Sequence, residues 1–206
     1  AGRRRGPRRL RGLRGLRRAR HEERALAERV RARFDRVDVV VNNAATTYRA
    51  AHEDLDALTD EAFLGVLDVN VLGPLRVVRA FADDLRAAGG AVVNIASISG
   101  YRAGGSSIAY GVSKAALLQL TRNLAVALAP EVRVNAVAPG TVATRWQTDL
   151  HGVDGFAERA RVERESVPLH RTSGPEHVAQ AVLGVLAMDM VTGEAVIVDG
   201  GKHVMY

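Results

Sequence analysis

Residues 91–114 read AVVNIASISGYRAGGSSIAYGVSK and contain the signals that decide the fold. A mostly apolar run at residues 91–96 comes first, as in a strand that is buried on both faces of a parallel sheet. A loop rich in glycine and serine follows, and the apolar stretch after it continues to residue 129, long enough for a helix. The segment therefore predicts a strand, a loop and a helix, the repeating unit of an α/β protein.

The remaining chain continues this alternation of strand-like and helix-like segments. We predict strands at residues 37–41, 132–137 and 194–198, and helices at residues 25–34, 59–85 with a kink or break at Gly73-Pro74, and 176–188. The alternation indicates an α/β fold with a doubly wound, mostly parallel sheet and helices on both faces. Right-handed crossovers bring the carboxyl ends of such strands to one edge, where ligands bind in folds of this class.

Tyr110 and Lys114 carry the clearest chemical signal. They lie four residues apart on the predicted helix, and side chains at this spacing share one face. A free phenol has a pKa near 10, and one cation at about 4 Å in an effective dielectric near 20 stabilises the phenolate by about 4 kcal/mol. A tyrosine beside a lysine can therefore exchange protons near neutral pH. The alternative interpretation is a solvated helix pair without a chemical role.

Further motifs follow one another in a fixed order. They are Asn42-Asn43-Ala44 after the strand at 37–41, Asn70 within Asp68-Val69-Asn70, Ser97 thirteen residues before Tyr110, Pro139-Gly140 with Thr144, and Asp199-Gly200-Gly201. With these motifs in this order, residues 22–206 resemble the short-chain dehydrogenases/reductases in their single-domain form, in particular the 3-oxoacyl-carrier-protein reductase-like branch. The resemblance implies a Rossmann-like sheet and an NAD(P)-dependent oxidoreductase that interconverts a ketone and a secondary alcohol by hydride transfer.

The resemblance also assigns catalytic roles to four residues. Tyr110 would give a proton to the carbonyl oxygen during reduction or accept it from an alcohol, and Ser97 would hydrogen-bond the same oxygen. Lys114 would lower the pKa of Tyr110 and hold the ribose hydroxyls of the nicotinamide. Asn70 would anchor a water that links Lys114 to solvent. Taken singly, Ser97 could instead terminate a strand and Asn70 could bond nearby backbone.

The cofactor, NAD or NADP, is implied to lie against residues that follow two of the predicted strands and against two residues of the helix at 107–129. They are Asn42, Ala44, Pro139, Gly140, Val142 and Thr144, together with Tyr110 and Lys114. Asn42 and Ala44 would line the adenosine side, and the backbone of Val142 would meet the nicotinamide amide. Ala45 stands where the family usually has a glycine. The residues that distinguish NAD from NADP belong to a strand that we do not find in the sequence, so this choice stays open.

One part of the family pattern has no counterpart in residues 1–37. The family opens with a strand, a Gly-rich turn that cradles the pyrophosphate, and a helix, whereas the glycines here stand among arginines with no apolar strand before them. We therefore expect an N-terminally truncated Rossmann-like fold, weak NAD(P) binding and little turnover by the chain as written. An impaired family remnant that serves as an oligomerisation partner stays open as an alternative.

The net charge of +6 comes from the N-terminal segment. Residues 1–20 hold ten arginines and no acidic residue, which leaves a net charge of −4 on the remaining 186 residues. We interpret residues 1–20 as a tail that is disordered or artefactual, from a wrong start or reading frame, and residues 21–206 as one Rossmann-like domain. The alternative is a protein that binds nucleic acid through this arginine-rich arm. The net negative charge of the remaining residues argues against it.

Composition bears on other classes of site and on location. The chain has no cysteine, which excludes disulfides and thiol catalysis, and its six histidines lack close ligand spacing, so we expect no metal site. No apolar run approaches the roughly 18 to 20 residues of a membrane span. We expect a cytoplasmic protein with a small-molecule carbonyl or alcohol substrate and no membrane partner.

Two helical segments bear on assembly and on substrate binding. The helix at residues 107–129 is apolar on nearly all sides, which predicts a homodimer or homotetramer built on this helix and on the one at 59–85. Residues 145–166 occupy the position of the family's mobile substrate lid. Trp146 in this segment could cover a substrate or could pack into the core.

Overall fold

The computed structural model describes residues 23–205, which divide into two units at residue 36. In the first unit, residues 23–31 form a helix, where the apolar spacing predicts one at 25–34. The predicted tail at residues 1–20 lies outside the described residues. Among the described residues, no helix combines the length and the apolar character that a membrane crossing requires.

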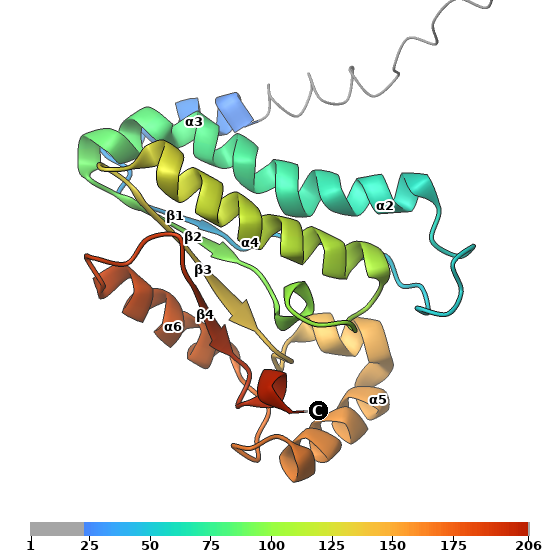
Figure 1. Cartoon of the computed structure of the whole chain (residues 1–206). Helices are drawn as coiled ribbons and strands as arrows, with labels where there is room; N and C mark the ends of the chain where they lie inside the picture. Colours follow the sequence, from blue (N-terminus) through green and yellow to red (C-terminus); the bar gives the residue numbers. More distant parts are fainter. Residues whose placement is uncertain (1–22, 206) are drawn as a thin grey trace, which may run out of the picture. The chain divides into compact units, whose positions relative to one another are not determined.

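The second unit contains a four-stranded parallel sheet, drawn in Figure 1. Its strands are β1 (Val39–Asn42), β2 (Ala91–Ile95), β3 (Arg133–Pro139) and β4 (Ala195–Val198), in that spatial order. Val40 pairs with Val92 and Val92 with Val134, so one row of valines crosses three strands. The side chains of β2 and β3 are almost wholly buried, as expected for central strands covered on both faces. The predicted α/β fold with a parallel sheet is confirmed.

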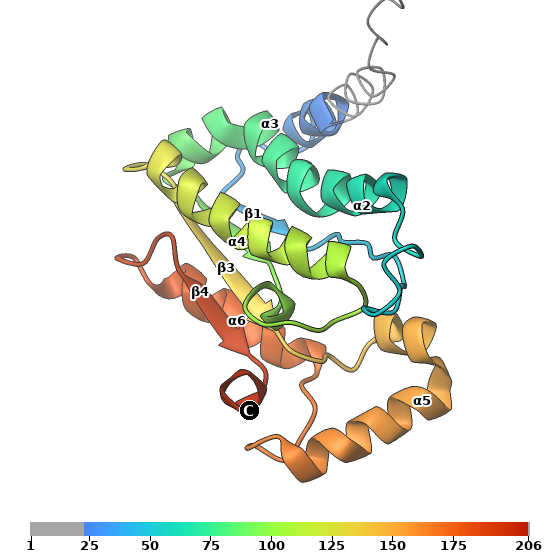
Figure 2. The same cartoon turned by 45° about the vertical axis from the view of Figure 1, so that its right-hand side comes forward.

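Helices cover both faces of this sheet, as Figures 1 and 2 show. On one face, α3 (Gly73–Ala88) packs over β1 and β2 and α4 (Ile108–Leu128) over β2 and β3. On the other face, α6 (Pro175–Ala187) packs on β2, β3 and β4. Leu118 joins the core under α4, and Val185 joins the core under α6. Two apolar layers therefore hold the sheet, and its strand ends stay free to carry polar groups.

The segment predicted as one helix at 59–85 is two helices joined by a π-helical turn. Thr59 caps α2 (Asp60–Leu67) by accepting a hydrogen bond from the Ala62 amide at 3.2 Å. The π-turn Asp68–Leu72 then leads into α3, whose first turn contains Pro74. The predicted break is confirmed, although the irregular turn lies just before Gly73 rather than at it. Such turns widen a helix locally, and this one carries Asn70.

The segment predicted as a lid forms α5 (Arg145–Ser166), which lies beyond the carboxyl ends of the strands in both views. Gly152 interrupts it with φ at 73°, a conformation that glycine adopts without steric cost. Two short 3-10 turns, η2 (Ile98–Gly100) after β2 and η3 (Lys202–Val204) after β4, complete this edge. The edge therefore combines strand ends, turns and a bent helix.

Candidate functional site

Tyr110 and Lys114 lie in the first two turns of α4, on the side that faces β2. The Ser107 hydroxyl begins this helix by accepting a hydrogen bond from the Tyr110 amide at 3.2 Å. The Lys114 Nζ lies 5.6 Å from the centre of the Tyr110 ring and donates a hydrogen bond of 2.9 Å to the Ile95 carbonyl. The two side chains therefore share one helix face, as their spacing predicts, and the lysine is anchored to the end of β2.

Ser97 follows β2 and brings a second hydroxyl to Tyr110. Its side chain begins the η2 turn by accepting a hydrogen bond from the Ser99 amide at 3.1 Å, and it also hydrogen-bonds Tyr110. Because the hydroxyl of Ser97 is fixed by backbone, it can orient a group that approaches Tyr110. The strand-ending role and the pairing with Tyr110 are both present, so the two interpretations of Ser97 are compatible.

The pKa of Tyr110 differs from the expectation. Burial raises this pKa above its ordinary value, and the hydrogen bond from Ser97 offsets the rise only in part. Burial also lowers the pKa of Lys114 to about 8, because its ammonium has left water for the Ile95 carbonyl. The predicted lowering of the tyrosine pKa by Lys114 is therefore not seen in this structure. A raised pKa keeps Tyr110 protonated at neutral pH, which is the state that donates a proton.

Asn70 is fully engaged with protein groups. Its side chain is 1% exposed; Oδ1 accepts from the Thr46 amide at 2.8 Å, and Nδ2 donates to the Thr46 carbonyl and to the Ser113 hydroxyl, each at 2.9 Å. Ser113 in turn donates to the Tyr110 carbonyl at 2.7 Å. Asn70 thus ties the segment after β1 to the first turns of α4, in agreement with the backbone-bonding interpretation.

Two cavities meet at Ser97 and Tyr110. We call the first, of about 270 Å³, the Arg159 cavity, and the second, of about 510 Å³, the Lys114 cavity. The residues common to their linings are Ser97, Tyr110, Gly140, Trp146 and Gln147. Trp146 packs against Tyr110 with 6.1 Å between ring centres. A group held in either cavity therefore has access to the same phenol.

The Lys114 cavity gathers most of the predicted cofactor residues. Its lining includes Ala44, Tyr110, Lys114, Pro139, Gly140, Val142 and Thr144. A glycine is required at position 140 for steric reasons, because a Cβ there would lie 2.7 Å from the Cβ of Asp199. Ala45 also lines the cavity, and its φ is not positive, because His170 is the only described non-glycine residue with a positive φ. The alanine is thus accommodated without backbone strain.

Asn42 departs from its predicted position in this cavity. Its Nδ2 donates a hydrogen bond of 2.8 Å to Asn94 on β2, and Asn94 donates to Thr121 of α4 at 2.9 Å. Asn43 lines the Lys114 cavity instead. Successive side chains of an extended strand point to opposite faces, so the last residue of β1 turns toward α4 and the next one toward the cavity.

A polar cluster that was not predicted from the sequence lies at the floor of the Arg159 cavity. Glu163 is 5% exposed and accepts hydrogen bonds from Thr141, Thr172 and Lys202. Burial alone would raise the pKa of Glu163, but the hydrogen bonds from Lys202 and Thr141 outweigh burial and lower this pKa. The chain has only two lysines, Lys114 and Lys202. The rarity of lysine is the one sequence signal that could have pointed to a role for Lys202.

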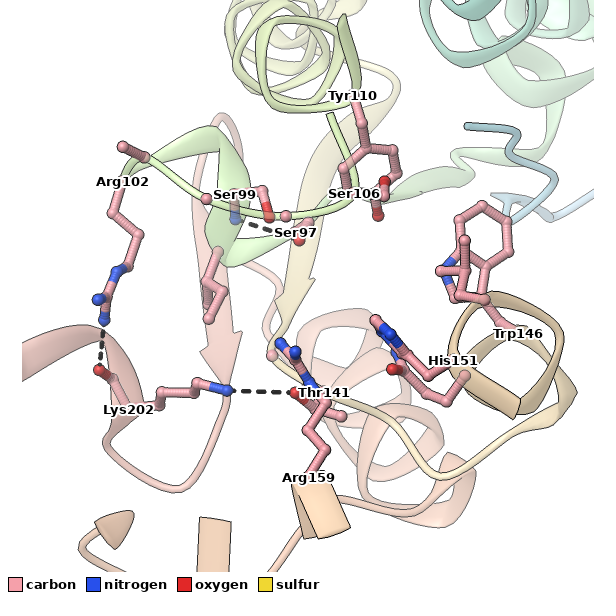
Figure 3. A pocket seen from close by; sticks show the side chains of 17 residues that line it. Ser97, Ser99, Arg102, Ser106, Tyr110, Thr141, Trp146, His151, Arg159 and Lys202 are labelled. Atoms are coloured by element: carbon pink, nitrogen blue, oxygen red, sulfur yellow. Dashed lines mark hydrogen bonds between the residues drawn. The ribbon is translucent and has the colours of Figure 1, made fainter. Parts of the chain in front are cut away.

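Figure 3 shows the arrangement of the Arg159 cavity. Tyr110 and Ser97 reach into it from α4 and η2, and Lys202 and Arg159 reach into it from the opposite side. Arg102 donates a hydrogen bond of 2.8 Å to the Lys202 carbonyl. Neither Arg102 nor Arg159 is distinguishable in a sequence so rich in arginine.

Among the described residues, no group of three acidic, histidine or cysteine side chains could hold a metal ion.

Comparison with known proteins gives a consistent result. A family model described as enoyl-(acyl carrier protein) reductase matches residues 18–203. The chain is 42% identical over 185 residues to a protein of Streptomyces violaceoruber assigned as ketoacyl reductase 2 of the granaticin polyketide synthase, covering 89% of this chain and 73% of that protein. It is 35% identical over 183 residues to carbonyl reductase family member 4 of Danio rerio, covering 86% and 74%.

Solved structures show the same likeness. A gluconate 5-dehydrogenase from Burkholderia cenocepacia, determined in complex with NADP and tartrate, superposes with a TM-score of 0.81 at 26% identity, over 91% of this chain and 72% of that one. A short-chain dehydrogenase/reductase-like protein from Burkholderia xenovorans superposes with a TM-score of 0.80 at 33% identity, over 90% and 73%. The sheet and its helices are thus shared with these proteins.

Proposed function

Because the chain belongs to the short-chain dehydrogenase/reductase family, we propose that it interconverts a ketone and a secondary alcohol, with NAD or NADP as the hydride carrier and Tyr110 as the proton donor or acceptor. The observation that carries this proposal is the pair of cavities that meet at Ser97 and Tyr110. A carbonyl compound in one cavity and a nicotinamide in the other would both lie against the phenol.

Tyr110 acts on the carbonyl oxygen in this scheme. During reduction the carbonyl carbon gains a hydride and its oxygen gains the phenolic proton of Tyr110, so the C=O double bond becomes a C–OH single bond. Ser97 donates a hydrogen bond to the same oxygen and stabilises the negative charge that develops there. A tyrosine phenol is protonated at neutral pH, which is the state that donates, while burial raises the pKa of Tyr110 and so makes it a weaker acid in this structure.

The residues of the Lys114 cavity fit the nicotinamide and ribose part of the cofactor. Lys114 has three N–H donors and spends one on the Ile95 carbonyl, which leaves donors for ribose hydroxyls. Val142 and Thr144 offer backbone and hydroxyl groups for an amide, and Pro139 offers an apolar surface for a ring. A nicotinamide held here would supply the hydride for reduction or accept it during oxidation. Ala44 and Asn43 line the far end, where the adenosine side would lie.

Asn70 is a positioning residue in this proposal. It fixes Thr46, close along the chain to Asn43 and Ala44, and it fixes Ser113, the neighbour of Lys114. By joining these two segments, Asn70 fixes two parts of the chain that line the Lys114 cavity relative to each other.

We propose in addition that the protein forms a homodimer or homotetramer through α2 and α4. Leu64 on α2 is 62% exposed, and Val126 and Val112 on α4 are 81% and 44% exposed. Light scattering of the purified chain should give a mass of two or four copies, and Val126→Glu should lower it. A monomer at micromolar concentration would refute this assembly.

The experiment for the proposed reaction uses reduced nicotinamide mononucleotide beside NADH and NADPH. This smaller carrier needs only the nicotinamide and ribose contacts, so the weak pyrophosphate binding expected from the sequence does not affect it. We expect small ketones to be reduced to alcohols with the mononucleotide, and Tyr110→Phe to stop the reduction. Absence of alcohol with all three carriers in the millimolar range would overturn the proposed function.

A further inference from the structure

The charged residues that line the Arg159 cavity all carry positive or titratable basic groups. They are Arg102, His151, Arg159 and Lys202, and among the described residues that line it there is no aspartate or glutamate. The remaining lining residues beside Tyr110 are neutral, among them Ser97, Ser106 and Trp146. A cavity next to a reactive phenol whose charged lining residues are all basic has an electrostatic preference that a neutral ketone would not use.

Lys202 contributes little net charge to this cavity. Its ammonium forms an ion pair with the buried carboxylate of Glu163 and a hydrogen bond of 3.3 Å with the Thr141 hydroxyl. The pair anchors η3 and fixes Lys202 at the floor of the cavity. Glu163 thereby neutralises the lysine, and the excess charge must come from the two arginines.

Arg102 and Arg159 retain their charges. Arg102 donates to the Lys202 carbonyl, a neutral group that orients its guanidinium and leaves the charge in place. Within the described residues, neither guanidinium forms an ion pair with a carboxylate. Each guanidinium has five N–H donors in a planar fork, a geometry that matches carboxylate and phosphate oxygens.

His151 lies beside Arg159 and lines the same cavity. Burial lowers the pKa of His151, and the charges of Arg159 and then Arg49 lower it further. Arg49 reaches this end of α5 through a hydrogen bond of 2.7 Å to the Leu150 carbonyl. The imidazole is therefore neutral at pH 7, and an anion that entered the cavity would favour its protonated form.

We propose that the substrate of the proposed reaction is a small carbonyl compound with an anionic group, a carboxylate or a phosphate, which Arg159 binds with support from Arg102. This inference rests on the proposed function, which puts the carbonyl at Ser97 and Tyr110. Figure 3 shows Arg159 and Lys202 across the cavity from these two hydroxyls, so one molecule can reach both ends. A cavity of about 270 Å³ is at the lower end of ligand pockets, which limits the substrate to a small molecule.

Trp146 makes binding measurable without turnover. It is the only tryptophan of the chain and lines the cavity, so a bound ligand should change its fluorescence. We would titrate two matched pairs of probes: acetoacetate against acetoacetamide for the carboxylate, and dihydroxyacetone phosphate against dihydroxyacetone for the phosphate. At least one anion should bind about tenfold or more tightly than its neutral partner. The pair with the larger preference identifies the anionic group.

Substitutions show which residues produce the preference for the anionic probe. Arg159→Gln should reduce the preference for the anion about tenfold and leave the affinity for the neutral probe unchanged. Arg102→Gln should reduce it less. Arg164→Gln is the matched control, because Arg164 is an exposed arginine of the same helix that does not line the cavity, and it should change nothing. Circular dichroism confirms that each variant is folded. Anion binding should also raise the pKa of His151, measured by NMR.

Two outcomes would overturn the inference. One is equal affinity for anionic and neutral probes, and the other is an anion preference that Arg159→Gln and Arg102→Gln both leave intact. The result is separable from the proposed reaction, because binding is measured without a hydride carrier. Selective anion binding without reduction would refute the reaction alone, and reduction of both members of a pair with equal affinity would refute the anionic substrate alone.

Discussion

The Arg159 cavity and the Lys114 cavity use the same phenol but differ in construction. Strand ends and small residues such as Ala44 and Pro139 form much of the Lys114 cavity, whose charged lining residues are the buried Lys114, tied to backbone, and Arg145 at the start of α5. The turn η2 with the loop at residues 102–106 after it, and the bent helix α5, form most of the Arg159 cavity, and within the described part of the chain neither of its two arginines pairs with a carboxylate. In the proposed function, α4 and the strand ends would hold the proton chemistry, and α5 with the loop after η2 would hold the charges that select a substrate.

Tyr110→Phe should have the largest effect, because both cavities use the phenol that it removes. Loss of the proton donor should reduce ketone reduction by about a hundredfold to ten-thousandfold. Binding of the anionic probe and of the mononucleotide should stay within about threefold, because the ring and its packing on Trp146 remain. Steady-state kinetics and Trp146 fluorescence measure the two effects. Tyr48→Phe, at a tyrosine that lines neither cavity, is the control, and retained turnover in Tyr110→Phe would remove the phenol from the mechanism.

Lys114→Met should separate the two cavities. Mononucleotide binding and turnover should fall about tenfold or more, whereas anion preference in the Arg159 cavity should persist.

The same variant should change stability in a pH-dependent way. Burial lowers the pKa of Lys114 from 10.5 to about 8, which corresponds to about 3 kcal/mol against the charged form in the folded protein. Between these two pH values the unfolded chain still holds a proton that the folded chain has lost, so the free energy of unfolding should rise with pH. Lys114→Met lacks this rise and should be about 1 to 3 kcal/mol more stable than the wild type at pH 7, after loss of the bond to Ile95. The free energies of unfolding of the wild type and of Lys114→Met are measured in urea from pH 7 to above 10. A difference between them that stays constant over this range would contradict the buried charge.

Asn70→Ala should loosen the Lys114 cavity alone. Removing the amide leaves the Thr46 backbone groups and the Ser113 hydroxyl without their partner, at a cost of about 2 to 4 kcal/mol. Chemical denaturation measures this loss, and mononucleotide affinity should fall while anion preference is kept. Asn123→Ala is the matched control, because Asn123 is an exposed residue of α4 and its loss should cost under about 0.5 kcal/mol. Equal effects of the two substitutions would argue against Asn70 as a positioning residue.

Gly140→Ala tests the floor that both cavities share, with the smallest expected effect. The added methyl would lie 2.7 Å from the Cβ of Asp199, and relieving this contact should cost about 1 to 3 kcal/mol of stability. Gly184→Ala on α6 is a control of opposite sign, since a methyl there meets nothing within 4 Å and alanine favours a helix by about 1 kcal/mol. If both substitutions stabilise the protein, the close approach at Gly140 is not a constraint.

The Lys114 cavity could be predicted from sequence because its determinants are local. The apolar runs place β2 and β3, and the spacing from Tyr110 to Lys114 fixes one helix face. The side chain of Asn42 shares the face of Val40 because successive side chains of β1 alternate, and it therefore hydrogen-bonds Asn94. The direction of a side chain at a strand end is set by the pleat, which an apolar run does not report.

The Arg159 cavity could not be predicted, since its residues meet only in three dimensions. Glu163 and Lys202 are 39 residues apart, and they join because α5 bends at Gly152 and returns beside η3. Arg159 is one of many arginines, so its residue type carried no information. The prediction that Lys114 lowers the pKa of Tyr110 is not borne out in this structure, because burial shifts the pKa of both groups. The size of the burial effect depends on the packing around each group, which the sequence does not report.

The most direct test of the account follows deuterium from the hydride carrier to the substrate. Reduced nicotinamide mononucleotide with deuterium at both C4 positions is incubated with the chain and with acetoacetate or acetoacetamide, and the products are analysed by mass spectrometry. We expect an alcohol that carries deuterium on the former carbonyl carbon with the wild-type chain and about a hundredth or less of that labelled yield with Tyr110→Phe. An alcohol without deuterium, or the same labelled yield from Tyr110→Phe, would contradict hydride transfer between the two cavities with Tyr110 as the proton donor.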